Sequence, residues 1–523
     1  MVGGWQLELG RVLPFMNSEQ PTTRQKQMIA LEGKRVLVIG LGASGVAASE
    51  LLCRKGAKVL AVDNAETEPL RQAAAALRSQ GVEVQLGVEQ PPEGHFDLAV
   101  VSPGVPRTNQ ILNGMVRRQA PVIGELELGY QHSLCLNIAI TGTNGKTTTT
   151  ELVERLLTQN QIKTVAAGNI GLPLCAVAER TRELDFLTLE VSSFQLETIQ
   201  FFRPTIAVLL NLTPDHLDRY PSLAEYAKAK ARLFANQQPF DWAVVQSEAL
   251  AQLRALKVEI PSKLVTFSAS ERTADLYLDR GLLISRLADW SGPLLDMRRS
   301  QLRGPHNAEN LMAALAAGRA LRIPLERMVA SLESYVPAPH RGELVAEING
   351  VKFINDSKAT NVDALYKALL ACPAGPGHEP NVWLIAGGKD KGFEYHEVGP
   401  LLSQRVKRAY LMGETREKIR AAWSLFTPCT LVDSLLEAVA DAARNAAPGD
   451  VVLLSPACSS FDQFQNYQHR GEVFRQAVRH WQTAAPGGGN SRVGDGRTTE
   501  TLTVNTQTEF AAGCLEAIPR RTH

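Results

Sequence analysis

The sequence predicts an α/β protein of three domains, each built on a mostly parallel sheet. Buried apolar strands alternate with helical segments along most of the chain, which is typical of parallel sheets covered by helices on both faces. Glycine-rich or polar loops repeatedly follow a strand and precede a helix. The length of 523 residues also suits three or four domains of ordinary size.

The first domain is predicted over residues 31–126. Its expected elements are strands at 34–40, 57–63 and 96–104, a helix at 46–56 and an exit segment at 120–130. The loop GLGASG follows the first strand, and Asp63 ends the second. A GxGxxG loop followed by an acidic strand end is typical of a dinucleotide fold, although any nucleotide diphosphate can occupy the same helix N-terminus.

The second domain is predicted over residues 127–337. Its expected elements are strands within 136–141, 185–193, 205–216 and 241–246, helices at 226–235 and 304–321, and a small antiparallel region at 270–303. The proline-containing run 335–343 is expected to link this domain to the third.

The third domain is predicted over residues 338–484. Strands followed by polar loops are expected within 350–361, 381–393, 408–414 and 450–464. Residues 1–30 are expected to be a poorly ordered extension, and the Gly/Thr-rich residues 485–523 a disordered tail. The sequence leaves open whether translation starts at Met1, Met16 or Met28.

Composition excludes several classes of protein. Lys and Arg number 55 and Asp and Glu 54, so the chain lacks the basic excess of a general nucleic-acid binder. It has no apolar run long enough for a transmembrane helix and no convincing signal peptide. The 7 cysteines are scattered without a CxxC pair, which favours reduced thiols in a cytoplasmic enzyme over disulfides or a zinc site.

The strongest chemical signal is TGTNGKTTTT (141–150), which lies between a strand and a helix. Gly142 and Gly145 would let backbone N–H groups face a phosphate, while Lys146 adds charge and Thr147 a hydroxyl for Mg²⁺. The common GxxxxGK[ST] pattern has a glycine where this chain has Ile140. The loop therefore predicts a nucleotide phosphate site through the GKT half of that pattern.

Polar residues also follow two strands of the second domain. Glu190 ends one strand, where a carboxylate near a phosphate loop is a candidate Mg²⁺ ligand or an ordinary capping group. Asp215, His216 and Asp218 cluster after another strand, a grouping that favours metal binding or proton transfer.

Three loops of the third domain carry dense polar sets. They contain Asp356, Lys358 and Thr360 with Arg341 upstream, then Lys389 and Lys391, then Ser459, Ser460 and Tyr467. Taken alone, each loop is more typical of a solvent-exposed turn than of a ligand site. Their repetition at the carboxyl ends of strands favours a ligand site, because open α/β sheets bind ligands at that edge.

Taken together, the motifs resemble the Mur ligase family, whose members build the peptide of the bacterial cell wall. The segments that carry the resemblance are GTNGKTTT, GNIG (168–171), LEVSSFQLE, NLTPDHLDRY and GPHNAENLMAAL. NDSKATN and SPACSSFDQFQNYQHRG resemble in particular the members that add D-glutamate. The resemblance covers about residues 34–480. It implies a Rossmann-like N-terminal domain for the UDP substrate, a central P-loop-type ATPase α/β domain, and a C-terminal Rossmann-like α/β domain.

The resemblance also implies roles for individual residues. The UDP substrate would contact Ala43, Ser44, Asp63, Asn64, Ser102 and Gly104. ATP would contact Gly142, Thr143, Asn144, Gly145, Lys146, Thr147, Thr148, Asn169, Asn307, Asn310, Arg341 and Asp356. D-Glutamate would contact Thr360, Lys391, Ser460 and Tyr467, the last of which is usually Phe in the family. The metal site would comprise Thr147, Glu190, His216 and Lys230, and the catalytic residues would be Lys146, His216 and Lys230.

The family also uses a carbamylated lysine. Lys228 and Lys230 both lie in the segment 226–235, and periodicity does not choose between them. The resemblance places the modification at Lys230. Carbamylation requires a neutral amine, hence a lowered pKa, and it creates an oxygen ligand suited to Mg²⁺.

The activity implied by the resemblance is ATP-dependent amide formation. D-Glutamate would be added to UDP-N-acetylmuramoyl-L-alanine through an acyl phosphate, giving ADP and phosphate, in peptidoglycan precursor synthesis. The expected cofactors are ATP and Mg²⁺. We expect a cytoplasmic monomer that binds no nucleic acid and does not span a membrane.

Three other functions compete with this interpretation. A dinucleotide-dependent oxidoreductase would use GLGASG and Asp63 but would leave the GTNGKT loop unexplained. A nucleotide-driven switch would hydrolyse ATP without dependence on an amino acid. Another ligase of the same superfamily would add a different amino acid, or glutamates to folate.

Overall fold

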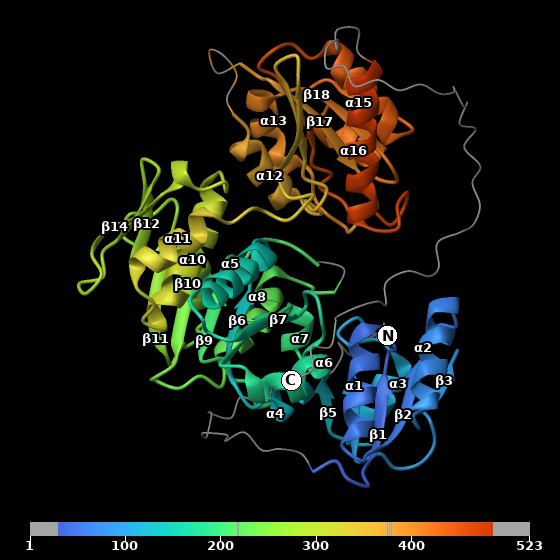
Figure 1. Ribbon diagram of the computed structural model, residues 1–523. Coiled ribbons are helices and arrows are strands. Elements are labelled where there is room, and N and C mark those ends of the chain that lie inside the picture. The colour runs from blue at the N-terminus through green and yellow to red at the C-terminus, as the bar shows by residue number, and fades with distance from the viewer. Residues whose placement is uncertain (1–29, 217–218, 374, 376, 378, 485–523) are drawn as a thin grey trace, which may run out of the picture.

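The computed structural model describes residues 30–216, 219–373, 375, 377 and 379–484. Figure 1 shows three α/β units, each built around its own sheet, in the order of the chain. The predicted fold class is therefore confirmed. The predicted extension up to residue 29, with Met16 and Met28, the predicted tail 485–523 and Asp218 lie outside the described residues.

The N-terminal unit is a parallel sheet in the order β3-β2-β1-β4-β5. Its strands are β1 Arg35–Ile39, β2 Lys58–Asp63, β3 Glu83–Leu86, β4 Leu98–Val101 and β5 Val122–Gly124, and its helices are α1 Ala43–Arg54, α2 Glu68–Ser79 and α3 Gln110–Arg117. The predicted helix begins earlier than residue 46, because α1 starts inside the glycine loop. Gly45 permits this close packing, since a Cβ there would lie 1.8 Å from the carbonyl oxygen of Gly40.

The central unit follows helix α4 (Glu125–His132) and has nine strands in the order β14-β13-β12-β11-β10-β9-β6-β8-β7. The strands are β6 Leu136–Thr141, β7 Thr164–Gly168, β8 Phe186–Glu190, β9 Ile206–Leu209, β10 Trp242–Gln246, β11 Lys263–Ser268, β12 Leu276–Asp279, β13 Leu282–Ser285 and β14 Gly292–Asp296. The last three form the predicted antiparallel region.

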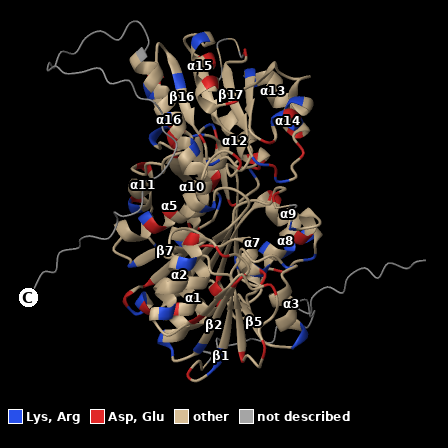
Figure 2. Cartoon of the chain, turned by 90° about the vertical axis from the view of Figure 1, so that its right-hand side faces the viewer, with Lys and Arg blue, Asp and Glu red and all other residues tan. Residues whose placement is uncertain are grey.

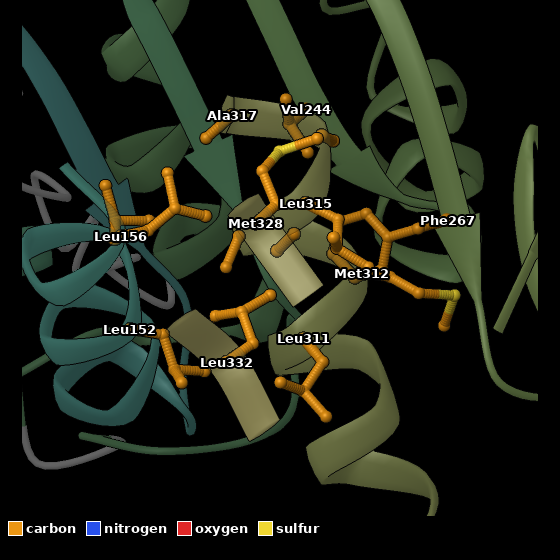
Figure 3. Close-up of a cluster of buried hydrophobic side chains, with 14 of the residues drawn as sticks. Leu152, Leu156, Val244, Phe267, Leu311, Met312, Leu315, Ala317, Met328 and Leu332 are labelled. Carbon is orange, nitrogen blue, oxygen red and sulfur yellow. The ribbon is translucent and has the colours of Figure 1, made fainter. Parts of the chain in front are cut away.

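Seven helices accompany the central sheet in the described part of the chain. They are α5 Lys146–Gln159, α6 Leu174–Val177, α7 Ser193–Leu196, α8 Leu223–Ala231, α9 Ser247–Ala255, α10 Pro305–Ala320 and α11 Leu325–Glu333. Figure 3 shows how α5, α10 and α11 bury Leu156, Leu315 and Met328 against Val244 and Phe267 of the sheet. This core fixes the start of α5 and the start of α10 relative to each other.

The C-terminal unit is a sheet in the order β15-β16-β20-β17-β18-β19, parallel except for β15. Its strands are β15 Glu343–Ile348, β16 Val351–Asn355, β17 Val382–Gly387, β18 Val406–Met412, β19 Cys429–Leu431 and β20 Val451–Leu454. Its helices are α12 Val362–Ala371, α13 Gly399–Arg405, α14 Arg416–Trp423, α15 Leu435–Asn445 and α16 Tyr467–Ala484. Because β20 lies between β16 and β17, the three polar loops that follow these strands meet at one edge.

Charge is mixed over the molecule. Figure 2 shows basic and acidic positions interspersed in all three units. Among the residues that the structure describes, no helix combines the length and the apolar composition that a membrane crossing needs.

Candidate active site

A cleft of about 720 Å³ lies at the carboxyl edge of the N-terminal sheet, between the loops that follow β1 and β4. All six residues predicted to contact the UDP substrate line it, namely Ala43, Ser44, Asp63, Asn64, Ser102 and Gly104. Asp63 accepts hydrogen bonds from the backbone N–H groups of Leu41 (2.7 Å) and Ala65 (2.9 Å), which fixes the loop before α1. This is the topological switch point of the sheet, where open α/β sheets bind ligands.

The glycine-rich loop between β6 and α5 is held by its neighbours. Asn211, directly after β9, accepts from the backbone N–H of Asn144 through its side chain (2.8 Å) and donates to the Asn144 carbonyl (3.0 Å). Gly145 has φ +85°, and a Cβ there would lie 2.4 Å from Oδ1 of Asn310. Only glycine fits both conditions. Lys146 curls back, and its Nζ donates to the carbonyls of Gly142 (3.0 Å) and Thr143 (2.8 Å).

Two predicted asparagines of α10 lie beside this loop. Asn310 accepts from the Thr149 hydroxyl (3.2 Å) and donates to Asn307 Oδ1 (3.1 Å). Asn307 in turn donates to the Arg303 carbonyl. Helix α10 therefore places its second turn, at Asn310, against the start of α5.

Glu190, at the end of β8, presents one free carboxylate oxygen. Its Oε1 accepts from Nδ2 of the predicted residue Asn169 (2.7 Å). Its Oε2 is buried and has no hydrogen-bond partner. A buried acceptor without a partner is costly unless a ligand satisfies it, so this oxygen fits a cation.

Lys230 and Lys228 differ in burial and in the groups that they contact. The Lys230 side chain is buried, and its Nζ donates to the Gly142 carbonyl (2.8 Å) and lies 3.4 Å from Thr141 Oγ1. Burial, with Lys146 as a second cause, lowers the pKa of Lys230 well below its usual value. Lys228 is exposed and pairs with Glu225 (3.0 Å).

His216 lies close to the phosphate loop in a left-handed backbone conformation, with φ +55°. Its backbone N–H donates to Asp215 Oδ1 (2.9 Å), and its ring packs 4.7 Å from that of Phe194. Burial lowers the pKa of His216, which favours the neutral imidazole, while Asp215 opposes the shift.

Loops of the C-terminal unit reach this region. Asn144 donates to Asp363 and lies 3.4 Å from Asn361 Oδ1, while the Asn361 side chain also donates to Asp215 (3.4 Å). Asp356 accepts from the Gly342 N–H (3.1 Å) and from Ser455 (3.2 Å), and burial raises its pKa to about 7.

The residues predicted to bind D-glutamate come from the three loops of the C-terminal sheet. Lys391 follows β17 and lies over the Phe393 ring, Ser460 is buried after β20, and Thr360 precedes α12. Tyr467 begins α16, and its ring is covered by the Lys358 ammonium at 4.2 Å from the ring centre.

Positive charges from the central and C-terminal units act on one another here. Burial lowers the pKa of Lys146, and the charges of Arg341 and Lys391 act in the same direction. Burial also lowers the pKa of Lys358 to about 8, with Arg341 contributing next. Cations gathered at one site need anions, and a triphosphate with a dicarboxylate would supply them.

Sequence reasoning did not assign roles to several residues that shape this region. They are Asn211 and Asn361, which hold Asn144, Tyr226, whose ring lies 4.7 Å from the Lys230 ammonium, and Lys358. Each stands in or beside a motif, but only the folded chain shows what it contacts. For Asn211, Lys358 and Asn361 the signal in the sequence was a polar loop after a buried strand, whereas Tyr226 lies inside helix α8.

The residues present fit Mg²⁺. In the described part of the chain, no three His, Cys, Asp or Glu side chains form a metal-holding group by themselves. Mg²⁺ is commonly held by one or two carboxylates together with substrate phosphates and water. The free oxygen of Glu190 beside the phosphate loop provides such a carboxylate.

A glycine-rich phosphate loop met by loops of the C-terminal unit, together with a cleft at the switch point of the N-terminal sheet, defines a multidomain, nucleotide-dependent enzyme. Family models match along the chain in the same order: a Mur ligase MurD-like N-terminal domain over residues 34–124, a Mur ligase middle domain over 140–318, and a Mur ligase glutamate ligase domain over 340–458. The chain belongs to the Mur ligase family, and the predicted resemblance is confirmed.

Curated relatives match over nearly their whole length. The chain is 42% identical to the UDP-N-acetylmuramoylalanine–D-glutamate ligase of Acidobacterium capsulatum, over 86% of this chain and 96% of the relative. It is 41% identical to the enzyme of the same name from Pelotomaculum thermopropionicum, over 85% of this chain and 97% of the relative.

Solved structures show the same fold at lower identity. The MurF ligase of Thermotoga maritima in complex with ADP has a TM-score of 0.56 and 16% identity, covering 86% of this chain and 99% of that one. The UDP-N-acetylmuramate–alanine ligase MurC of Thermotoga maritima has a TM-score of 0.54 and 18% identity, covering 86% and 100%.

Proposed function

We propose that this chain is an ATP-dependent ligase that adds D-glutamate to UDP-N-acetylmuramoyl-L-alanine in peptidoglycan precursor synthesis. The observation that carries the proposal is the match, above 40% identity and over nearly the whole length, to relatives that bear this activity in their names. The polar loops of the third unit support it, because they bring cations to the phosphate loop where two anionic substrates would meet.

The chemistry requires activation of a carboxylate, which is a poor electrophile. The L-alanyl carboxylate attacks the γ-phosphorus of ATP, an oxygen–phosphorus bond forms, and ADP leaves. The amine of D-glutamate then attacks the acyl carbon, loses a proton, and phosphate leaves. Positioning and neutralisation of charge do most of this work.

The protein's groups have distinct tasks in this proposal. Lys146 turns from the loop carbonyls of Gly142 and Thr143 to the phosphates and neutralises the charge that develops there. Asn169, Asn307, Asn310, Arg341 and Asp356 bind other parts of ATP. Thr147, Glu190, His216 and Lys230 would hold Mg²⁺, which supplies further neutralisation of phosphate charge when bound.

We assign the cleft of the N-terminal unit to the UDP part of the acceptor. The first-turn N–H groups of α1 and the loop of Ser102 and Gly104 face it. Lys391, Thr360, Ser460 and Tyr467 would hold D-glutamate through an ammonium, two hydroxyls and ring packing, since its carboxylates need cations and hydrogen-bond donors.

Carbamylation of Lys230 belongs to the same proposal. Burial lowers the pKa of the Lys230 amine and so favours the neutral form, which is the form that attacks CO₂. A nitrogen–carbon bond forms, and the nitrogen proton leaves to solvent. Labelled bicarbonate should give a carbamate carbon signal by NMR in the native enzyme that is absent from Lys230→Arg and kept in Lys228→Arg. An active native enzyme without this signal would contradict the assignment.

The activity itself is tested with an amino-acid panel. The chain is incubated with UDP-N-acetylmuramoyl-L-alanine, ATP and Mg²⁺, and phosphate release is measured with D-glutamate, L-glutamate, D-aspartate, L-lysine or meso-diaminopimelate. We expect release with D-glutamate above the control without amino acid. Release with another member instead would redirect the specificity, and release independent of amino acid would favour a simple ATPase.

A further inference from the structure

The loop that follows β4 lines the N-terminal cleft on one side and a second cavity on the other. Ser102, Pro103 and Val105 border both. The second cavity, of about 400 Å³, lies between the N-terminal and central units. Inside its own unit the loop is held by Val105, which packs against the core, and by Ser102, whose hydroxyl donates to the Gly40 carbonyl (2.8 Å). Polar contacts from the central unit hold the side of the loop that faces the second cavity.

Arg219 of the central unit supplies such contacts. Its Nη1 donates to the carbonyl of Val105 (3.2 Å) and lies 3.5 Å from that of Pro103. The same guanidinium forms two hydrogen bonds to Glu197, at 2.8 and 3.3 Å. The planar fork of arginine can reach a carboxylate and backbone carbonyls together, which lysine cannot.

Glu197 is the centre of the cluster. It also accepts from the Tyr220 hydroxyl and from Arg107 of the N-terminal unit (3.2 Å). Burial raises the pKa of Glu197, but hydrogen bonds from Arg219 and Tyr220 outweigh it, so the net shift is downward and the carboxylate stays charged. One largely buried carboxylate therefore binds cations from two units.

The cluster continues to the phosphate-transfer region through His216. The backbone N–H groups of Arg219 and Tyr220 both donate to the His216 carbonyl, at 2.9 and 3.0 Å. The Arg219 guanidinium lies 4.2 Å from the centre of the Phe194 ring, which also packs against the His216 ring. His216 and the Pro103–Val105 loop are thus tied to the same ion pair.

We propose that Glu197 and Arg219 are positioning residues, which fix the loop of the UDP-substrate cleft against His216 so that the acceptor carboxylate reaches the phosphate loop. The inference rests on the proposed function for its substrate. It adds two residues that were not predicted to contact the metal or the nucleotide; Arg219 reaches the predicted metal residue His216 through its backbone N–H.

The test measures KM values separately for the UDP acceptor and for ATP. In Glu197→Gln and Arg219→Met, the KM for the acceptor should rise at least about ten-fold while the KM for ATP stays within about two-fold, because the ATP contacts lie elsewhere. Arg219→Lys should fall between wild type and Arg219→Met, since it keeps the charge without the fork. An unchanged acceptor KM in folded Glu197→Gln would overturn the proposal.

A matched control separates positioning from stability. Arg203 forms a similar two-bond pair with Asp241 inside the central unit, at 2.8 and 3.0 Å. Arg203→Met should lower the melting temperature and leave both KM values unchanged. If it raises the acceptor KM as much as Arg219→Met, the effect is one of general stability and the proposal fails.

Two additions keep the test decisive. Arg107 is half-exposed, so Arg107→Ala should fold even if Glu197→Gln does not. Arg107→Ala should raise the acceptor KM two- to five-fold, and no rise would overturn the proposal.

Calorimetry with UDP serves as a second probe. A wild type that binds UDP but forms no D-glutamyl product would remove the proposed function, while weaker UDP binding by Glu197→Gln would still support the positioning role. Equal UDP affinity of Glu197→Gln and wild type, or no UDP binding by the wild type, would overturn the positioning role.

Discussion

The contact between the N-terminal and central units is apolar, whereas the contact between the central and C-terminal units is polar. The N-terminal and central units share one hydrophobic core, in which Val38 and Leu51 pack in the same cluster as Leu128 of α4 and Cys175 of α6. Between the central and C-terminal units, no buried hydrophobic cluster of the described residues joins the two. Polar side chains at the phosphate loop make the contact there instead.

This difference indicates which unit moves. A continuous apolar core resists separation, whereas a small polar interface permits relative motion of domains. We therefore expect the C-terminal unit to open and close over the phosphate loop while the other two units stay together. Such motion would let ATP and amino acid enter and product leave.

The largest expected effect falls on the phosphate loop, where the polar interface meets the nucleotide. Lys146→Ala should lower turnover by at least about 100- to 1,000-fold, because the charge on the phosphates loses its partner. Melting temperature should change little, since the side chain mainly bonds carbonyls of its own loop. Lys228→Ala, at an exposed lysine of the same unit, is the control. Wild-type turnover in Lys146→Ala would contradict the phosphate assignment.

Leu128→Ala should destabilise the hydrophobic core that the N-terminal and central units share. Leu128 is fully buried in the cluster that spans two units, so the truncation should cost about 2–5 kcal/mol in the free energy of unfolding. Leu253→Ala, in a core confined to the central unit, should cost a similar amount. Only Leu128→Ala should also weaken binding of the UDP substrate. Equal effects of both variants on UDP binding would mean that the shared core does not couple the units.

Glu125 makes the same interface sensitive to pH. Burial raises its pKa to about 7, although its Oε1 accepts from the Cys175 N–H (2.7 Å). The pKa of Glu125 is higher in the folded state than in the unfolded state. Its contribution to the free energy of unfolding is therefore fully present below about pH 4.5 and is lost as pH rises through about 7. The free energy of unfolding of Glu125→Gln, measured in urea relative to that of wild type, should therefore increase by roughly 3 kcal/mol from pH 5 to pH 8. The same difference at both pH values would show that Glu125 does not titrate in this range.

Much of the fold was predictable because its signals are local. Apolar runs between glycine turns marked the strands, and GTNGKT stood between a strand and a helix. The choice between Lys228 and Lys230 was not local. Both lie in one short helix, and only packing against Thr141 and Gly142 buries one of them.

The contacts between units were also beyond local signals. Arg219, Glu197 and Val105 are far apart in sequence, and their meeting depends on how α4 and α6 pack against the first sheet. The roles assigned to individual site residues remain predictions. What the structure adds is that the loops carrying many of them lie at the carboxyl edges of three sheets, while Lys230, Asn307 and Asn310 lie in helices.

The polar interface should respond to Asp363→Ala with the smallest effect. Asp363 accepts from Asn144 of the phosphate loop, so its loss should lower kcat/KM for ATP and for D-glutamate about ten-fold, as expected for one hydrogen bond to a charged group. The free energy of unfolding should change by less than about 1 kcal/mol, because no core is disturbed. Steady-state kinetics and urea unfolding measure the two quantities.

The control for Asp363→Ala is its partner within α12. Lys367 pairs with Asp363 at 2.8 Å but does not contact Asn144, so Lys367→Met removes the ion pair and leaves the contact between units in place. It should keep kcat/KM near the wild-type value, and Asp363→Asn, which retains an acceptor, should recover most of the loss. If Lys367→Met falls as far as Asp363→Ala, the charge pair of α12 rather than its bond to the phosphate loop controls closure. The second interface would then depend on an ion pair, as the Pro103–Val105 loop does at the first.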